Sequence, residues 1–130
     1  TQKAAALSPK DADVHLNLGI ILKDLGRLND AVISYKQAIA IKPNYDEAYN
    51  NLGNTLQELG ELDNAEASYR QAILLKPNYG NAHNNLGNIL RVSKKYEEAI
   101  YHFDILKNDF GLTNNQLKAI DQQSKNLENQ

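Results

Sequence analysis

Proline recurs at a fixed interval along this chain, and the residues between the prolines repeat nearly in phase. Pro9, Pro43 and Pro77 are spaced 34 residues apart, and they divide the sequence into three similar segments, 12–45, 46–79 and 80–113. A fixed period of this length is typical of a helical repeat solenoid, in which each repeat buries its apolar face only against its neighbours. We therefore expect an extended surface for a partner rather than a closed pocket for a small substrate.

Charge and composition exclude several classes of partner. The chain has 130 residues, a formal net charge of −2 and no cysteine, and its longest cationic run is Lys94-Lys95. Such a balance predicts no nucleic-acid partner and no anionic membrane surface. No apolar stretch approaches the roughly 18 residues of a membrane span. Without cysteine, neither a disulfide framework nor a thiol nucleophile is available.

Each repeat reads as two antiparallel helices. In the second repeat, residues 48–59 and 65–75 carry apolar side chains at helical spacing. Gly60 lies between them, where a left-handed C-terminal cap favours glycine, and Asp63 is a candidate N-cap. Pro77 ends the second helix. The first repeat has the same pattern, with Gly26, Asn29 and Pro43 in these roles.

Small residues recur inside the helices. Glycine in a helix interior costs roughly 1 kcal/mol relative to alanine, so a packing role is expected for it. We expect each first-helix glycine to face a second-helix alanine and to let the two backbones approach. These pairs are Gly19 with Ala31, Gly53 with Ala65, and Gly87 with Ala99. No strand precedes the glycines, which argues against a phosphate-binding loop.

The repeated positions resemble the tetratricopeptide repeat (TPR) family over residues 12–113. The shared features are Leu-Gly in the first helix, alanine early in the second helix, and an aromatic residue four positions later, at Tyr35, Tyr69 and Phe103. The resemblance implies an all-α fold, a right-handed superhelical solenoid of helix-turn-helix hairpins. The expected segments are a remnant of a preceding repeat (1–11), three repeats (12–45, 46–79, 80–113) and a C-terminal capping helix (114–130).

The ends of the chain depart from the repeat pattern. Lys94 stands where the other repeats have the turn glycine, so we expect a left-handed lysine and a weaker third hairpin. Residues 113–116 read as a capping box, and Leu117, Ile120 and Leu127 are predicted to face the third hairpin. We expect a short helix near 2–8, so that the chain begins inside a longer repeat array.

The resemblance implies that the inner face of each first helix binds a peptide. The candidate groove residues are mostly neutral amides: Asn17, Asn51, Asn85, Asn50, Asn84, Asn54, Asn88, Leu16, Ile20, Lys23, Gln57 and Arg91. The first three share one repeat position and should form a ladder of exposed side chains without partners. An amide offers a donor and an acceptor to a peptide backbone. The ladder resembles that in the repeat region of O-linked N-acetylglucosamine transferases; the alternative is a solvated polar face.

A second binding mode of the family fits poorly. Carboxylate-clamp repeats hold acidic C-terminal tails with lysine and arginine. The matching positions here are Leu16, Ile20, Asn51, Asn81 and Asn85. A terminal carboxylate would lack its charge-assisted partners at these positions.

No catalytic or metal-binding pattern is present in the sequence. None of the three histidines has a second ligand at metal spacing in the sequence. His15 and His83 occupy a packing position, and His102 is predicted to point outward. Hydrolase, zinc-protease and phosphate-loop motifs are absent. We therefore predict no catalysis, no cofactor and no metal in this chain.

The leading functional hypothesis is a non-catalytic scaffold, in the cytoplasm, that binds an extended peptide or a segment of a partner protein. The alternative is a substrate-recruiting arm of a larger enzyme, such as a glycosyltransferase, whose catalytic domain lies outside this chain. A third hypothesis is weak self-association through an exposed N-terminal end of the repeat array.

Overall fold

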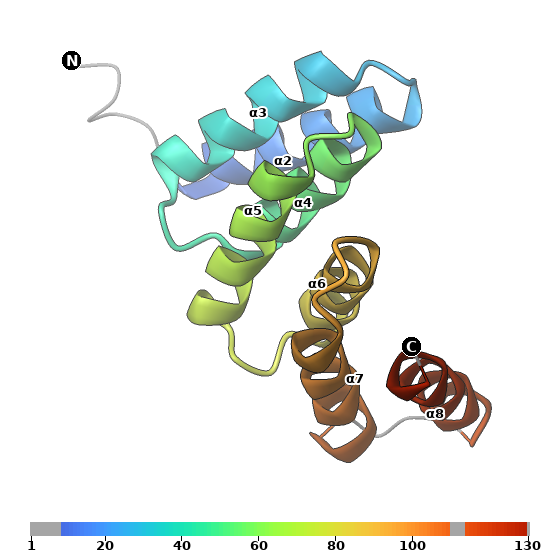
Figure 1. The fold of residues 1–130 in the computed structure, drawn as a ribbon. Coiled ribbons are helices and arrows are strands. Elements are labelled where there is room, and N and C mark those ends of the chain that lie inside the picture. The colour runs from blue at the N-terminus through green and yellow to red at the C-terminus, as the bar shows by residue number, and fades with distance from the viewer. Residues whose placement is uncertain (1–8, 110–113, 130) are drawn as a thin grey trace. The chain divides into compact units, whose positions relative to one another are not determined.

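The computed structural model describes residues 9–109 and 114–129, which form seven helices and no strand (Figure 1). The helices are α2 (Pro9–Asp24), α3 (Leu28–Ile41), α4 (Asp46–Glu58), α5 (Leu62–Leu75), α6 (Gly80–Val92), α7 (Tyr96–Asp109) and α8 (Asn114–Glu128). This confirms the predicted all-α repeat of helical hairpins. The helix expected near residues 2–8 lies outside the described residues, as does the start of the predicted capping box. The first unit, residues 1–76, holds α2–α5, and the second, residues 77–130, holds α6–α8.

Tight glycine turns close both hairpins of the first unit. Gly26 and Gly60 have positive φ angles of 81° and 82°. Around the first turn, Gly26 N donates to the Lys23 carbonyl at 2.9 Å, and Arg27 N donates to the Leu22 carbonyl at 2.8 Å. These bonds satisfy carbonyls that the helix end leaves open. The glycine caps predicted from the sequence are confirmed.

The helix starts after these turns differ from the prediction. α3 and α5 begin at Leu28 and Leu62, so Arg27 and Glu61 are the N-cap residues and neither makes a side-chain capping bond. The prediction of Asn29 and Asp63 as N-caps was therefore wrong. The chain re-enters a helix two residues after the glycine, which leaves Asp63 in the first turn, where a carboxylate favours the helix dipole.

The glycines inside the first helices make room for aromatic rings. A Cβ added at Gly19 would lie 2.5 Å from the Tyr35 ring, and one added at Gly53 would lie 2.6 Å from the Tyr69 ring. Both rings are fully buried. The expected glycine–alanine pairing was wrong in its partner: the second-helix alanines are buried, but the aromatic residue four positions further on is what meets the glycine. Sequence spacing alone did not show which side chain crosses the hairpin.

Polar contacts join the two hairpins of the first unit. The buried Tyr45, the last residue of the first repeat, directly precedes α4, and its hydroxyl donates to Asp13 Oδ1 at 2.5 Å. Burial, together with this hydrogen bond, raises the pKa of Tyr45. Lys23 Nζ lies 3.2 Å from Glu58 Oε1, which links α2 to α4. The first-helix face therefore carries bonds that hold the unit together.

The second unit has the predicted left-handed lysine. Lys94 has φ 64° and is the one non-glycine residue with positive φ among the described residues. It occupies the turn between α6 and α7, where Lys94 N donates to the Arg91 carbonyl at 3.0 Å. The turn therefore repeats the geometry of the glycine turns with a side chain that disfavours it.

A buried histidine pair joins α6 and α7. His83 Nδ1 and His102 Nδ1 are 2.8 Å apart, and His83 Nε2 lies 2.8 Å from the Pro77 carbonyl. Because a carbonyl only accepts, His83 carries its proton on Nε2, and His102 Nδ1 then donates to His83 Nδ1. The prediction that His102 points outward was wrong, since only 6% of it is exposed. The pair lies on the hairpin interface, where its partner from the other helix was not apparent in the sequence.

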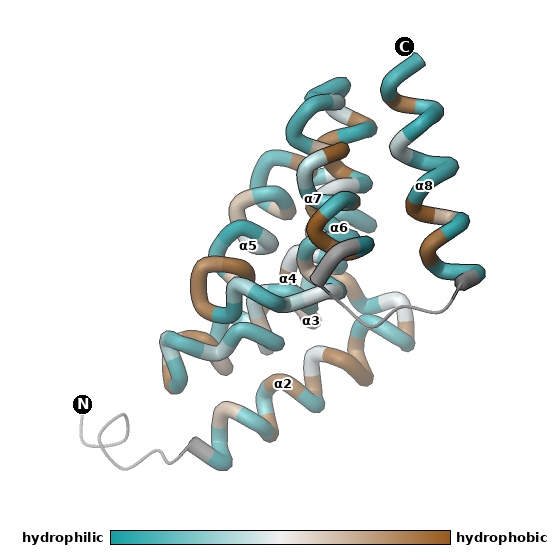
Figure 2. Tube along the Cα trace, turned by 90° about the horizontal axis from the view of Figure 1, so that it is seen from below, coloured by the Kyte–Doolittle hydropathy of each residue, from teal (hydrophilic) through white to brown (hydrophobic). Residues whose placement is uncertain are grey.

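α8 packs against α7 through few contacts. Figure 2 shows a largely hydrophilic helix with isolated hydrophobic positions. Leu127 is buried, whereas Leu117 and Ile120 are only half-buried, so the main anchor lies nearer the C-terminus than expected. Lys107 of α7 donates to Asp121 Oδ1 at 2.8 Å, and this bond raises the pKa of the Lys107 ammonium group.

The left-handed turn predicts a stabilising substitution. Lys94→Gly should raise the free energy of unfolding by about 1 kcal/mol, because a left-handed L-residue costs about that much. Chemical denaturation followed by circular dichroism measures the change.

Lys95→Gly is the matched control, because Lys95 follows without a positive φ angle. It should leave stability unchanged or lower it. A loss of stability in Lys94→Gly would show that the lysine side chain contributes more than its backbone conformation costs.

The anchor of α8 predicts a destabilising substitution. Leu127→Ala should lower the free energy of unfolding by about 2 kcal/mol, the low end for a buried leucine, because the site lies near the chain end. Leu117→Ala, at a half-buried position of the same helix, should cost less. Equal melting temperatures for Leu127→Ala and the parent chain would contradict the docking of α8 through this residue.

Candidate functional site

The first helices of the first unit present part of the predicted groove. Asn17 of α2 is exposed, and Asn51 of α4, at the equivalent repeat position, is half-buried. The backbone carbonyl of Asn51 accepts a hydrogen bond from Thr55 Oγ1 at 3.0 Å, so this bond does not use the Asn51 side chain. Ile20, three residues after Asn17, is half-buried. Asn17 and Asn51 therefore remain the best candidates for contact with a peptide in this unit.

Two other groove candidates hold a core tyrosine. The Tyr69 hydroxyl lies 2.6 Å from Asn54 Oδ1 and 2.9 Å from Gln57 Oε1. Burial raises the pKa of Tyr69, so its hydroxyl stays protonated and donates. The amide oxygens of Asn54 and Gln57 share this single hydroxyl proton within the repeat. Their amide N–H groups are what these residues could offer a ligand.

Leu16 and Asn50 are corrections to the predicted groove. Each is only 4% exposed. They share one repeat position, three residues before the glycine of the first helix, which places them on the packed side of α2 and α4. The predicted apolar seat formed by Leu16 and Ile20 is therefore wrong with respect to Leu16.

The same repeat position is open in the second unit. Asn84 lies three residues before Gly87 and is exposed. It continues a helical row along α6 that ends at Arg91, which is also exposed, with Asn88 half-buried between them. Asn85 is half-buried and already takes part in an interaction. The expectation that all three ladder residues lack partners therefore fails at Asn85.

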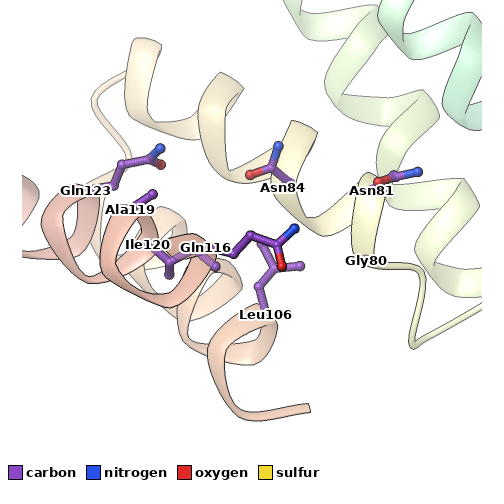
Figure 3. A pocket seen from close by; sticks show the side chains of 8 residues that line it. All are labelled: Gly80, Asn81, Asn84, Leu106, Gln116, Ala119, Ile120 and Gln123. Carbon is purple, nitrogen blue, oxygen red and sulfur yellow. The ribbon is translucent and has the colours of Figure 1, made fainter. Parts of the chain in front are cut away.

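A cavity of about 370 Å³ lies among α6, α7 and α8. Figure 3 shows that α6 contributes Asn81 and Asn84, α7 contributes Leu106, and the rest of the lining comes mainly from α8. The lining residues are Gly80, Asn81, Asn84, Leu106, Gln116, Ala119, Ile120 and Gln123. None has an ionisable side chain. The cavity combines four amides with an aliphatic floor.

A second cavity of about 250 Å³ extends this region along α6 and α8. It is lined by Arg91, Gln123, Asn126 and Leu127. Gln123 belongs to both cavities, so together they follow the space between the two helices. We call the residues of both cavities the α6–α8 groove.

The contribution of α8 was missed in the sequence analysis, which assigned 114–130 only a capping role. The polar groove residues Gln116, Gln123 and Asn126 recur seven and three residues apart, a spacing that places them along one side of a helix. That periodicity was the available signal. These polar residues were instead interpreted as the solvent-exposed surface of a capping helix.

The α6–α8 groove is suited to hydrogen bonding. Among residues 9–109 and 114–129, no group of three or more His, Cys, Asp or Glu side chains is placed to hold a metal ion. Within the same ranges, no helix is both long and apolar enough to cross a membrane. Amide side chains present donors and acceptors in the pattern of a peptide group.

Family models match most of the chain in overlapping segments. Models described as TPR repeat and tetratricopeptide repeat match residues 21–60, 46–79 and 1–33. The chain contains tetratricopeptide repeats. A model of the Est1 DNA/RNA binding domain matches residues 65–103. A search of the curated proteins found no match.

Solved TPR domains have a similar fold. The first TPR domain of Spaghetti (RPAP3), bound to an HSP90 peptide SRMEEVD, aligns with a TM-score of 0.80 and 20% identity, over 90% of this chain and 95% of that one. The TPR2B domain of yeast Sti1, in complex with an Hsp70 peptide, gives 0.82 and 22%, over 92% and 98%. The first TPR domain of human RPAP3 gives 0.80 and 22%, over 94% and 98%. At these identities the likeness concerns the fold.

Proposed function

We propose that this TPR chain is a non-catalytic interaction scaffold that binds an extended peptide segment along its first helices. The observation that carries the proposal is the α6–α8 groove, an open, amide-lined space next to the exposed first-helix face. Two of the similar TPR domains are described with bound chaperone peptides, which supports peptide binding as the use of such a face.

The chemistry of the face favours an uncharged stretch of peptide. The exposed or half-buried candidates Asn17, Asn51 and Asn85 are neutral, and Lys23 already pairs with Glu58. A terminal carboxylate would therefore find few free cations on these helices. We propose backbone recognition by amides, in contrast to recognition of an acidic chain end.

Nucleic-acid binding is the less favoured use of the same helices. The Est1 model carries that description, but the formal net charge of −2 provides no excess of cations for phosphate contacts. Lys94-Lys95 remains the longest cationic run. Protein or peptide partners therefore remain the proposal.

The proposal predicts the effect of removing three amides. A randomised peptide library should yield binders to the parent chain, and Asn17→Ala/Asn51→Ala/Asn85→Ala should weaken them at least about tenfold, since each lost backbone hydrogen bond contributes roughly 0.5–1.5 kcal/mol. Fluorescence anisotropy with a selected peptide measures the dissociation constant. Circular dichroism checks that the fold persists.

The matched control replaces three asparagines outside the predicted asparagine ladder, Asn29, Asn44 and Asn78, which are all exposed. This control should bind as the parent does. Equal binding by the Asn17/Asn51/Asn85 variant and the control would mean that the three asparagines form a solvated face. A library without any binder would contradict peptide binding itself.

A further inference from the structure

The cavity among α6, α7 and α8 has the size of a ligand site. Its volume of about 370 Å³ falls within the range of roughly 300–1,000 Å³ seen for ligand pockets. Leu106, Ala119 and Ile120 supply aliphatic surface, and the amides of α6 and α8 complete the lining. The aliphatic surface is complementary to an apolar side chain, and the amides are complementary to the polar backbone of a peptide.

The lining discriminates by charge. A carboxylate or an ammonium group that entered the cavity would lose hydration without meeting an opposite charge, which costs free energy. An aliphatic side chain would instead bury apolar area against Leu106 and Ile120. The lining therefore favours an uncharged occupant.

One acceptor in the lining lacks a donor. Gln123 Oε1 is inaccessible to solvent and has no hydrogen-bond partner among the described residues. A buried acceptor without a partner is unfavourable. A rotation of this side-chain amide that exposed the oxygen to the cavity would let it accept from a peptide N–H.

The repeat position of Asn84 differs in exposure between the two units. At the repeat position of Asn84, Leu16 and Asn50 are buried, whereas Asn84 is exposed and lines the cavity. The helix that borders it, α8, contributes amides to the lining. At this position the third repeat therefore offers an accessible amide, whereas the equivalent residues of the earlier repeats are buried.

From these observations we infer that the cavity is a specificity pocket for one aliphatic side chain of an extended peptide, whose flanking peptide groups are held by the amides of Asn84 and Gln123. The inference rests on the proposed function and adds the class of residue that is selected. Leucine-like side chains are accepted, and acidic and basic ones are rejected.

The test uses the full chain and small probes. N-acetyl-leucine N-methylamide and N-acetyl-glutamate N-methylamide are titrated separately into isotope-labelled protein, followed by NMR. The leucine probe should shift the side-chain amide signals of Asn84 and Gln123, with an affinity on the order of millimolar, as expected for so small a ligand. The glutamate probe should cause shifts at least about fivefold smaller at the same concentration.

A filled pocket provides the mutational control. Ala119→Phe places a ring in the cavity and should abolish the shifts from the leucine probe. Lys118→Phe adds the same ring at the neighbouring exposed position, which does not line the cavity, and should keep them. Melting curves confirm that both variants are folded.

Three results of the NMR experiments would overturn the inference. Equal shifts from the leucine and glutamate probes would show no selection, and unchanged shifts in Ala119→Phe would place the probe elsewhere. Signals at Asn84 and Gln123 that move with protein concentration alone would assign the cavity to a second copy of the chain. If library peptides bind the parent and Ala119→Phe equally, the proposed function stands and the pocket fails. If no peptide binds but the leucine probe does, the proposed function fails, and the cavity is a site for small apolar amides only.

Discussion

The contact between a first-helix glycine and a second-helix aromatic ring determines how each repeat packs. In the first repeats, Gly19 and Gly53 face Tyr35 and Tyr69 so closely that an added methyl group would overlap the ring. Burial of this kind raises the pKa of Tyr35 to about 12. The close approach fixes which side of each first helix is packed, and hence which side remains free.

The free side determines what the molecule can bind. The remaining first-helix positions include amides such as Asn17 and Asn84, and in α2 also exposed apolar residues such as Leu18 and Ile21. In the second unit, α8 lies across from this side and supplies amides of its own, including Gln123. α8 therefore both packs on the third repeat and completes the α6–α8 groove. The stability of this repeat is thereby connected to the proposed recognition of a peptide.

The repeat, its hairpins and its turns were predictable because they depend on local features, namely the 34-residue period and residues such as Gly60 and Lys94. Features that depend on contacts between helices were predicted less well. His102 was expected to point outward and instead bonds to His83, and Leu16 was expected in the groove and instead is buried. Helical spacing defines which residues share a face, but it does not define which face meets which neighbour.

The packing claim is tested most directly by Gly53→Ala, measured in the parent chain and in a Tyr69→Leu background. With the ring present, the added Cβ should lower the free energy of unfolding by about 1–2 kcal/mol, because overpacking outweighs the gain in helix propensity. With leucine in place of the ring, the same substitution should be neutral or stabilising by up to about 1 kcal/mol. Stabilisation of similar size in both backgrounds would contradict the account.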